Sequence, residues 1–176
     1  GNTTMKYDTL KDLYLDELRD VYDAENEIVK ALPKMVESAS SPELRNAFAH
    51  HLEQTRRHVT RLEQVFEGMG EKPKAKKCDG VRGILEEGED LMGQKGDQTV
   101  LDAGLIAGAQ RVEHYEMAVY GSLRTWAERM GNSQAARLLE ETLGEEKEAD
   151  HKLTQIAEQS VNRQAAAGTS AQFGAH

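Results

Sequence analysis

The sequence predicts an all-α protein, a bundle of four long helices in one domain. Apolar residues recur at steps of three and four over stretches of roughly 30 residues, the spacing that gathers them on one face of a helix. Only 3 of the 176 residues are proline and 5% are aromatic, a composition that favours helices over sheet. The two halves of the chain also repeat one pattern, so we expect two similar helical hairpins.

The first hairpin comes from the N-terminal part of the chain. Its first helix is expected over about residues 9–38, and Glu25 occupies a position of the apolar stripe. Ser40–Glu43 has the composition of a turn and an N-cap, and it opens a second helix that continues to about residue 68. His58 lies on the border of the apolar face of that helix.

The connection between the two hairpins is too long for a tight helix–helix turn. It extends from about residue 71 to residue 98 and contains a short expected helix over residues 81–92. Such a length suits a crossover along the side of the bundle, as ferritin-like folds use.

The second hairpin repeats the first. Its helices are expected over about residues 99–130 and from the turn Gly131–Ser133 to about Val161. Glu116 falls in the apolar stripe of the former, and Glu146 and Asp150 hold central positions in the latter. We expect the domain to span residues 1–161 and the Ala-, Gly-, Ser- and Gln-rich residues 162–176 to be a disordered tail.

The repeat places the polar stripe positions at one depth. Superimposing Glu25 on Glu116 aligns the hairpins without a gap, and Glu146 then corresponds to Thr55. The inward polar groups of all four helices, with His58 one turn from Thr55, should therefore meet in one layer at mid-bundle.

Carboxylates in such a layer need compensation, because burying an unpaired charge is costly. One solution is a dimetal centre: Glu25 and Glu116 as one pair of ligands, Glu146 on the last helix, and His58 and Asp150 as completions. Oxygen donors with an imidazole suit iron or manganese better than structural zinc. The alternative is a buried polar network without metal. The candidate partners of the carboxylates in such a network are Arg111, Lys147 and His58.

Other candidate side chains are expected outside the ligand set. His51, Glu53 and Glu113 are interpreted as solvated or supporting residues, and His114 and His151 as surface residues.

Composition limits the partners and the compartment. The net charge of −9 makes nucleic acid an unexpected partner. No stretch approaches the roughly 20 apolar residues of a membrane helix, so no membrane partner is expected. The single Cys78 suits a reducing compartment, which predicts a cytoplasmic protein.

Several short motifs occur along the chain: Asp23–Glu25, His51–Thr55, Cys78, Gly83–Glu87, Val112–Glu116, Tyr120–Gly121 and Glu145–Asp150. Together they resemble the YciE/YciF family (DUF892) of bacterial ferritin-like stress proteins. Gln54 and His58 depart from the pattern, since relatives often carry Glu and Gln there. The resemblance implies a ferritin-like four-helix bundle, commonly a homodimer, with a link to stress responses and a dimetal centre.

Two functions follow as hypotheses. The first is a stress-associated iron or manganese protein, redox-active toward peroxide or dioxygen. The second is a metal-free dimeric stress protein with a structural or interaction role, in which the polar layer sets the helix register.

Overall fold

The computed structural model describes residues 6–169, and its regular elements within that range are helices. This confirms the all-α prediction. In chain order the helices are α1 (Leu10–Ser38), α2 (Pro42–Gly68), α3 (Asp79–Met92), α4 (Gln98–Arg129), α5 (Ser133–Ile156), the π-helix Ala157–Val161 and α6 (Asn162–Ala166).

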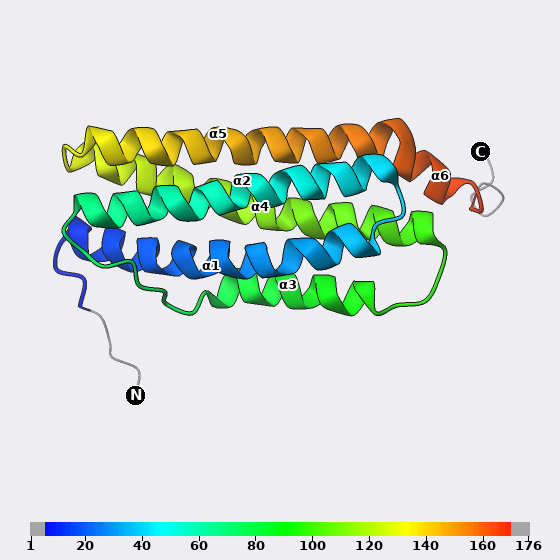
Figure 1. The fold of residues 1–176 in the computed structure, drawn as a ribbon, viewed down its shortest axis with the longest axis horizontal. Helices are drawn as coiled ribbons and strands as arrows, with labels where there is room; N and C mark the ends of the chain where they lie inside the picture. The colour runs from blue at the N-terminus through cyan, green and yellow to red at the C-terminus, as the bar shows by residue number, and fades with distance from the viewer. Residues whose placement is uncertain (1–5, 170–176) are drawn as a thin grey trace, which may run out of the picture.

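The four long helices α1, α2, α4 and α5 lie lengthwise beside one another (Figure 1). Helix α1 packs on α2, α4 packs on α5, and the two pairs contact each other through α1–α4 and α2–α5. The shorter α3 lies against α4 and α1, along the lower edge of the view in Figure 1. The connection between α2 and α4 therefore follows the side of the long helices, as its length predicted.

The helix ends agree with the sequence signals. Ser41 and Asn132, which occupy equivalent places in the repeat, are the N-caps of α2 and α5, and each side chain accepts a hydrogen bond from a backbone N–H of the first turn. Thr9 forms a capping box with Asp12 at the start of α1. Helices α1, α2 and α4 begin and end within two residues of the expected bounds, and α5 begins at the expected turn.

The C-terminal end differs from the expectation. Helix α5 stops at Ile156, and the helical path continues through a π-helical turn and α6 to Ala166, beyond the expected boundary at residue 161. Val161 is buried and gives this continuation an apolar contact with the core. The rest of the expected disordered tail includes residues 170–176, which lie outside the described range.

One buried carboxylate fastens the α1–α2 turn to α4. Asp102 of α4 is 1% exposed. It accepts hydrogen bonds from the backbone N–H groups of Ser40 and Ser41, both at 2.9 Å, and from the Ser40 hydroxyl at 2.7 Å. Charged acceptors form the stronger hydrogen bonds of proteins, so this contact ties the two hairpins together at one end.

A second carboxylate fastens α3 to α1. Asp23 accepts from the backbone N–H of Cys78 at 2.8 Å and from Nε of Arg82 at 3.0 Å. Gly80, next to this anchor, lies so close to Tyr115 of α4 that a Cβ atom there would be 2.6 Å from the ring. Helix α3 thus covers α4 at Tyr115, whose hydroxyl also donates a hydrogen bond to Asp20 of α1 at 3.4 Å.

Apolar side chains fill the space between the long helices. Large buried members from all four include Leu18, Phe48, Leu123 and Leu139. None of the helices in the described range is long and apolar enough to cross a membrane.

Candidate metal centre

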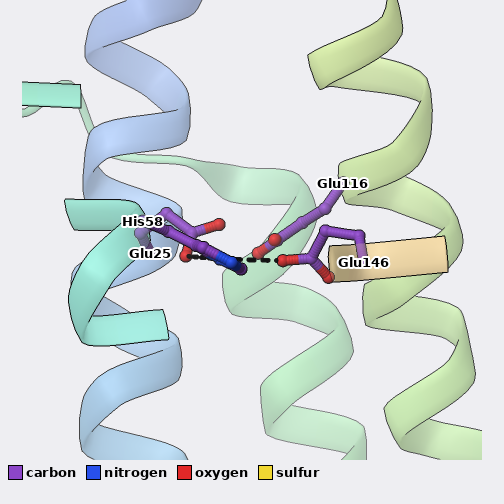
Figure 2. A group of neighbouring side chains, drawn as sticks. All are labelled: Glu25, His58, Glu116 and Glu146. Carbon is purple, nitrogen blue, oxygen red and sulfur yellow. Dashed lines mark hydrogen bonds and ion pairs between the residues drawn. The ribbon is translucent and has the colours of Figure 1, made fainter. Parts of the chain in front are cut away.

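Four buried side chains, one from each long helix, point toward one another (Figure 2). They are Glu25 of α1, His58 of α2, Glu116 of α4 and Glu146 of α5, and each is at most 1% exposed. One potential ligand atom of each lies within 4.8 Å of those of the other three. The predicted polar layer is therefore present at the depth that the repeat indicated.

His58 stands between two of these carboxylates. Its Nδ1 atom lies 3.2 Å from Oε2 of Glu25, in hydrogen-bond geometry, and 3.0 Å from Oε1 of Glu146, without that geometry. Its Nε2 atom lies 3.3 Å from Oε1 of Glu145. Arg61 in turn donates to Glu145 at 2.6 Å, so a charged pair at the edge of the site supports the imidazole from outside.

A second group shares one member with the first. His51 of α2, Glu113 of α4 and Glu146 have potential ligand atoms within 4.8 Å of one another. Nε2 of His51 lies 2.9 Å from Oε1 of Glu113 and 3.9 Å from Oε2 of Glu146. On its other side, Nδ1 of His51 is 3.1 Å from Oε1 of Gln54, which orients the ring. The two groups therefore meet at Glu146.

Many carboxylate oxygens in these groups lack partners. One oxygen of Glu25, one of Glu113, and both oxygens of Glu116 and Glu146 are buried and have no hydrogen-bond partner among the described residues. The hydroxyl of Tyr120, whose ring packs 6.4 Å from that of His58, is also buried without a partner in this range. Buried polar groups are ordinarily satisfied, so this concentration of unpartnered oxygens requires an explanation.

The pKa shifts report how the negative charge is distributed. Burial raises the pKa of Glu116 well above its ordinary value, and repulsion from Glu146 and Glu25 adds to the effect. Burial likewise raises the pKa of Glu146 well above its ordinary value, with the charge of Glu113 adding. Burial alone would raise the pKa of Glu25. The hydrogen bond with the Glu116 carboxyl and the charge of His58 outweigh burial, so the pKa of Glu25 is lowered.

His51 and Glu113 behave as an ion pair. Burial alone would lower the pKa of His51, but the charge of Glu113 raises it; burial alone would raise the pKa of Glu113, but the charge of His51 lowers it. The raised pKa values of Glu116, Glu146 and His51 all favour the protonated forms, and this lowers the net negative charge of the centre. Divalent cations would perform the same compensation.

The predicted ligands fall into two sets. Glu25, His58, Glu116 and Glu146 come together, whereas Asp150 belongs to neither group within the described residues. The Asp150 side chain is half-buried, and its Oδ1 atom lies 3.2 Å from Nε2 of the exposed His114 of α4.

The supporting residues also divide. His114, His151 and Glu53 are exposed, as expected. His51 and Glu113 are 7% and 2% exposed, so burial excludes the solvated alternative for both and leaves the supporting one. Their positions relative to the stripe carried a signal: His51 lies one helical turn before Thr55, and Glu113 one turn before Glu116.

Comparison with known proteins identifies relatives over nearly the whole chain. A family model described as a domain of unknown function, DUF892, matches residues 9–166. Protein YciF of Escherichia coli strain K12 is 43% identical over 162 residues, which cover 92% of this chain and 98% of YciF.

Solved structures agree in fold. The E. coli stress protein YciF superposes with a TM-score of 0.85 and YcfI of Rhodopseudomonas palustris with 0.84; both are 43% identical, over 89% of this chain and 99% of each relative. A protein of Xanthomonas campestris pv. campestris, 21% identical, has a TM-score of 0.71 over 88% of this chain and 95% of its own, which is a likeness of fold alone.

Proposed function

The chain belongs to the DUF892 family, and on this premise we propose that it is a ferritin-like four-helix-bundle protein that binds two divalent ions of iron or manganese. The observation that carries the proposal is the set of buried, unpartnered carboxylate oxygens on Glu25, Glu113, Glu116 and Glu146. A carboxylate supplied by each long helix, or an imidazole in its place, is the arrangement of carboxylate dimetal proteins.

The two groups of side chains provide a place for each ion. Glu25, His58 and Glu116 would hold the first, His51 and Glu113 would hold the second, and Glu146 would bridge the two. Four carboxylates balance two divalent cations in charge. Oxygen donors with one imidazole per ion favour iron or manganese over a closed zinc site.

The surrounding residues would orient the ligands. Gln54 lies on the Nδ1 side of His51, and Glu145, held by Arg61, lies on the Nε2 side of His58. Such outer contacts fix the ring and its tautomer in metal-binding histidines. A redox-active ion in this position would supply electron-transfer chemistry toward peroxide or dioxygen.

Elemental analysis of untagged protein from iron- and manganese-supplemented cells tests the proposal. We expect about two equivalents of metal per chain. A Glu25→Ala, Glu116→Ala variant should lose the metal and keep its helical circular dichroism, and a Glu86→Ala, Glu87→Ala variant on the exposed face of α3 is the matched control. Near-zero metal in the wild type, unchanged after anaerobic addition of ferrous ions, would refute the proposal.

A second candidate is a metal-free structural protein. The His51–Glu113 pair and the His58–Glu25 hydrogen bond already compensate part of the buried charge. A structural role has been suggested for the R. palustris relative YcfI. In this case the Glu25→Ala, Glu116→Ala variant should unfold or lose stability although the wild type never takes up metal, because breaking a buried pair leaves an uncompensated charge.

The remaining features of the proposal come from the family. E. coli YciF is called a stress protein, and we propose a stress-associated role and a homodimer for this chain. Light scattering after size-exclusion chromatography should give twice the chain mass of 19.6 kDa; the monomer mass would contradict the dimer. A cytoplasmic location stays a prediction.

A further inference from the structure

A cavity of about 500 Å³ lies between the long helices, next to the candidate metal centre. Its apolar walls come mainly from α1, α2, α4 and α5, and Leu85 of α3 also lines it. They include Ile28, Leu32, Phe48, Ala109, Val112 and Leu153. The volume is within the range of sites that hold small organic ligands and far exceeds the space of a dioxygen or peroxide molecule.

One wall of the cavity is polar and belongs to the centre. His51, Gln54 and Glu113 line it, and the first and last of these are the side chains of the second group. Glu113 is buried, and its Oε2 atom has no hydrogen-bond partner among the described residues. The cavity therefore combines apolar walls with a buried acceptor beside the proposed metal position.

The cavity opens to solvent between α2 and α5. Its lining there includes the exposed residues Glu43, His50, Glu148 and Lys152. The charges at this opening are mixed, because Lys152 lies there with Glu43 and Glu148. At the polar wall, the unpartnered Oε2 atom of Glu113 would repel an anionic head group and would accept a hydrogen bond from an uncharged donor.

We propose that this cavity binds an uncharged amphipathic molecule, an aliphatic chain with a terminal hydroxyl. The chain lies along the apolar walls and the hydroxyl lies at His51 and Glu113, beside the metal centre. The position of the hydroxyl next to a metal ion rests on the proposed function, whereas binding in the cavity does not require the metal.

Calorimetric titration of the metal-free, full-length protein tests the binding. We expect 1-octanol to bind, and 1-hexanol to bind more weakly by about fourfold per missing methylene, which corresponds to about 0.8 kcal/mol for each buried CH₂. Octanoate, which has the same length and a negative head group, should bind at least roughly tenfold more weakly than 1-octanol. Absence of alcohol binding, or equal binding of octanoate, would overturn the proposal.

Variants locate the ligand. Ala109→Leu and Ala149→Leu place extra carbons in the cavity from α4 and α5, and each should weaken 1-octanol binding at least roughly tenfold. Ala118→Leu makes the same change at an exposed position of α4 outside the cavity lining and should leave binding unchanged. Circular dichroism confirms that each variant is folded, and unchanged binding in both folded cavity variants would overturn the location.

Nuclear magnetic resonance of 1-octanol with the manganese-loaded protein tests the orientation. The paramagnetic ion should broaden the signal of the CH₂ next to the hydroxyl more than that of the terminal methyl. Equal broadening, or greater broadening of the methyl, would overturn the orientation. Octanol binding by a protein that takes up neither iron nor manganese refutes the proposed function alone, and metal uptake without octanol binding refutes the cavity proposal alone.

Discussion

Replacing Glu116 by glutamine isolates the cost of charging the buried centre. Glu116 is 1% exposed, and burial together with the charges of Glu146 and Glu25 raises its pKa well above the ordinary 4.5. Glutamine has nearly the shape of the protonated side chain but cannot ionise. The metal-free Glu116→Gln protein should therefore keep a stability that the wild type loses as the pH rises.

The sign of the effect follows from the direction of the pKa shift of Glu116. A group whose pKa is raised by folding stabilises the folded state fully below its unfolded pKa, and this contribution disappears as the pH rises through the folded pKa. The size follows from burial, because a buried polar group without a partner costs about 1–3 kcal/mol and a charged one costs more. As the pH rises from 5 to 8, the variant should therefore gain at least about 1 kcal/mol over the wild type, or roughly 2–4 °C in Tm for a chain of this length.

Thermal unfolding of both proteins in the presence of chelator, at pH 5 and at pH 8, measures the difference. Glu86→Gln makes the same chemical change at an exposed position of α3 and should shift stability by less than about 0.5 kcal/mol at either pH. A Tm difference between Glu116→Gln and wild type that does not grow with pH would refute the assignment of a protonated carboxyl. With saturating manganese the order should reverse, because only the wild type keeps all ligands.

Three further substitutions test separate contacts. His51→Ala leaves Glu113 buried without its charged partner and should cost about 3–5 kcal/mol at neutral pH in urea denaturation, whereas a loss below 1 kcal/mol would exclude the ion pair. Asp102→Ala removes three hydrogen bonds from the α1–α2 turn and should cost about 2–4 kcal/mol in the same experiment; a neutral effect would contradict the fastening role. Gly80→Ala places a Cβ 2.6 Å from the Tyr115 ring and should cost about 1–3 kcal/mol, while an unchanged denaturation midpoint would show that the ring moves freely.

The residues of the centre that the sequence predicted are carboxylates at helix positions where the spacing calls for an apolar side chain. Glu25, Glu116 and Glu146 interrupt stripes whose helical spacing is otherwise regular, and the hairpin repeat gave their common depth. His58 was identified less directly, from its place at the stripe border and its relation to Thr55. All four lie in one group in the structure.

His51 and Glu113 were missed because burial depends on neighbouring helices as well as on the helix itself. Helix α4 contacts α1, α3 and α5, so a wider part of its surface is buried than a single apolar stripe indicates. Glu113 falls in that wider part, and His51 faces it from α2 at 2.9 Å. A sequence pattern gives the direction of a side chain around its own helix, but the width of the covered face comes from tertiary packing.

The same limit explains Asp150. It lies one turn beyond Glu146, which suggested a common inward direction, but side chains four residues apart differ in direction by about 40° on a helix of 3.6 residues per turn. That difference is sufficient to place Asp150 at the α4–α5 surface, beside His114.

The distribution of the polar layer over two hairpins has a consequence for folding. Helices α1 and α2 can pair locally, as can α4 and α5, because each pair is joined by a short turn. Neither hairpin alone carries the complete group of four. The α1–α2 hairpin contributes Glu25 and His58, and the α4–α5 hairpin contributes Glu116 and Glu146. The complete group of four therefore exists only while the two hairpins are docked, and separation of either hairpin would take the whole group apart.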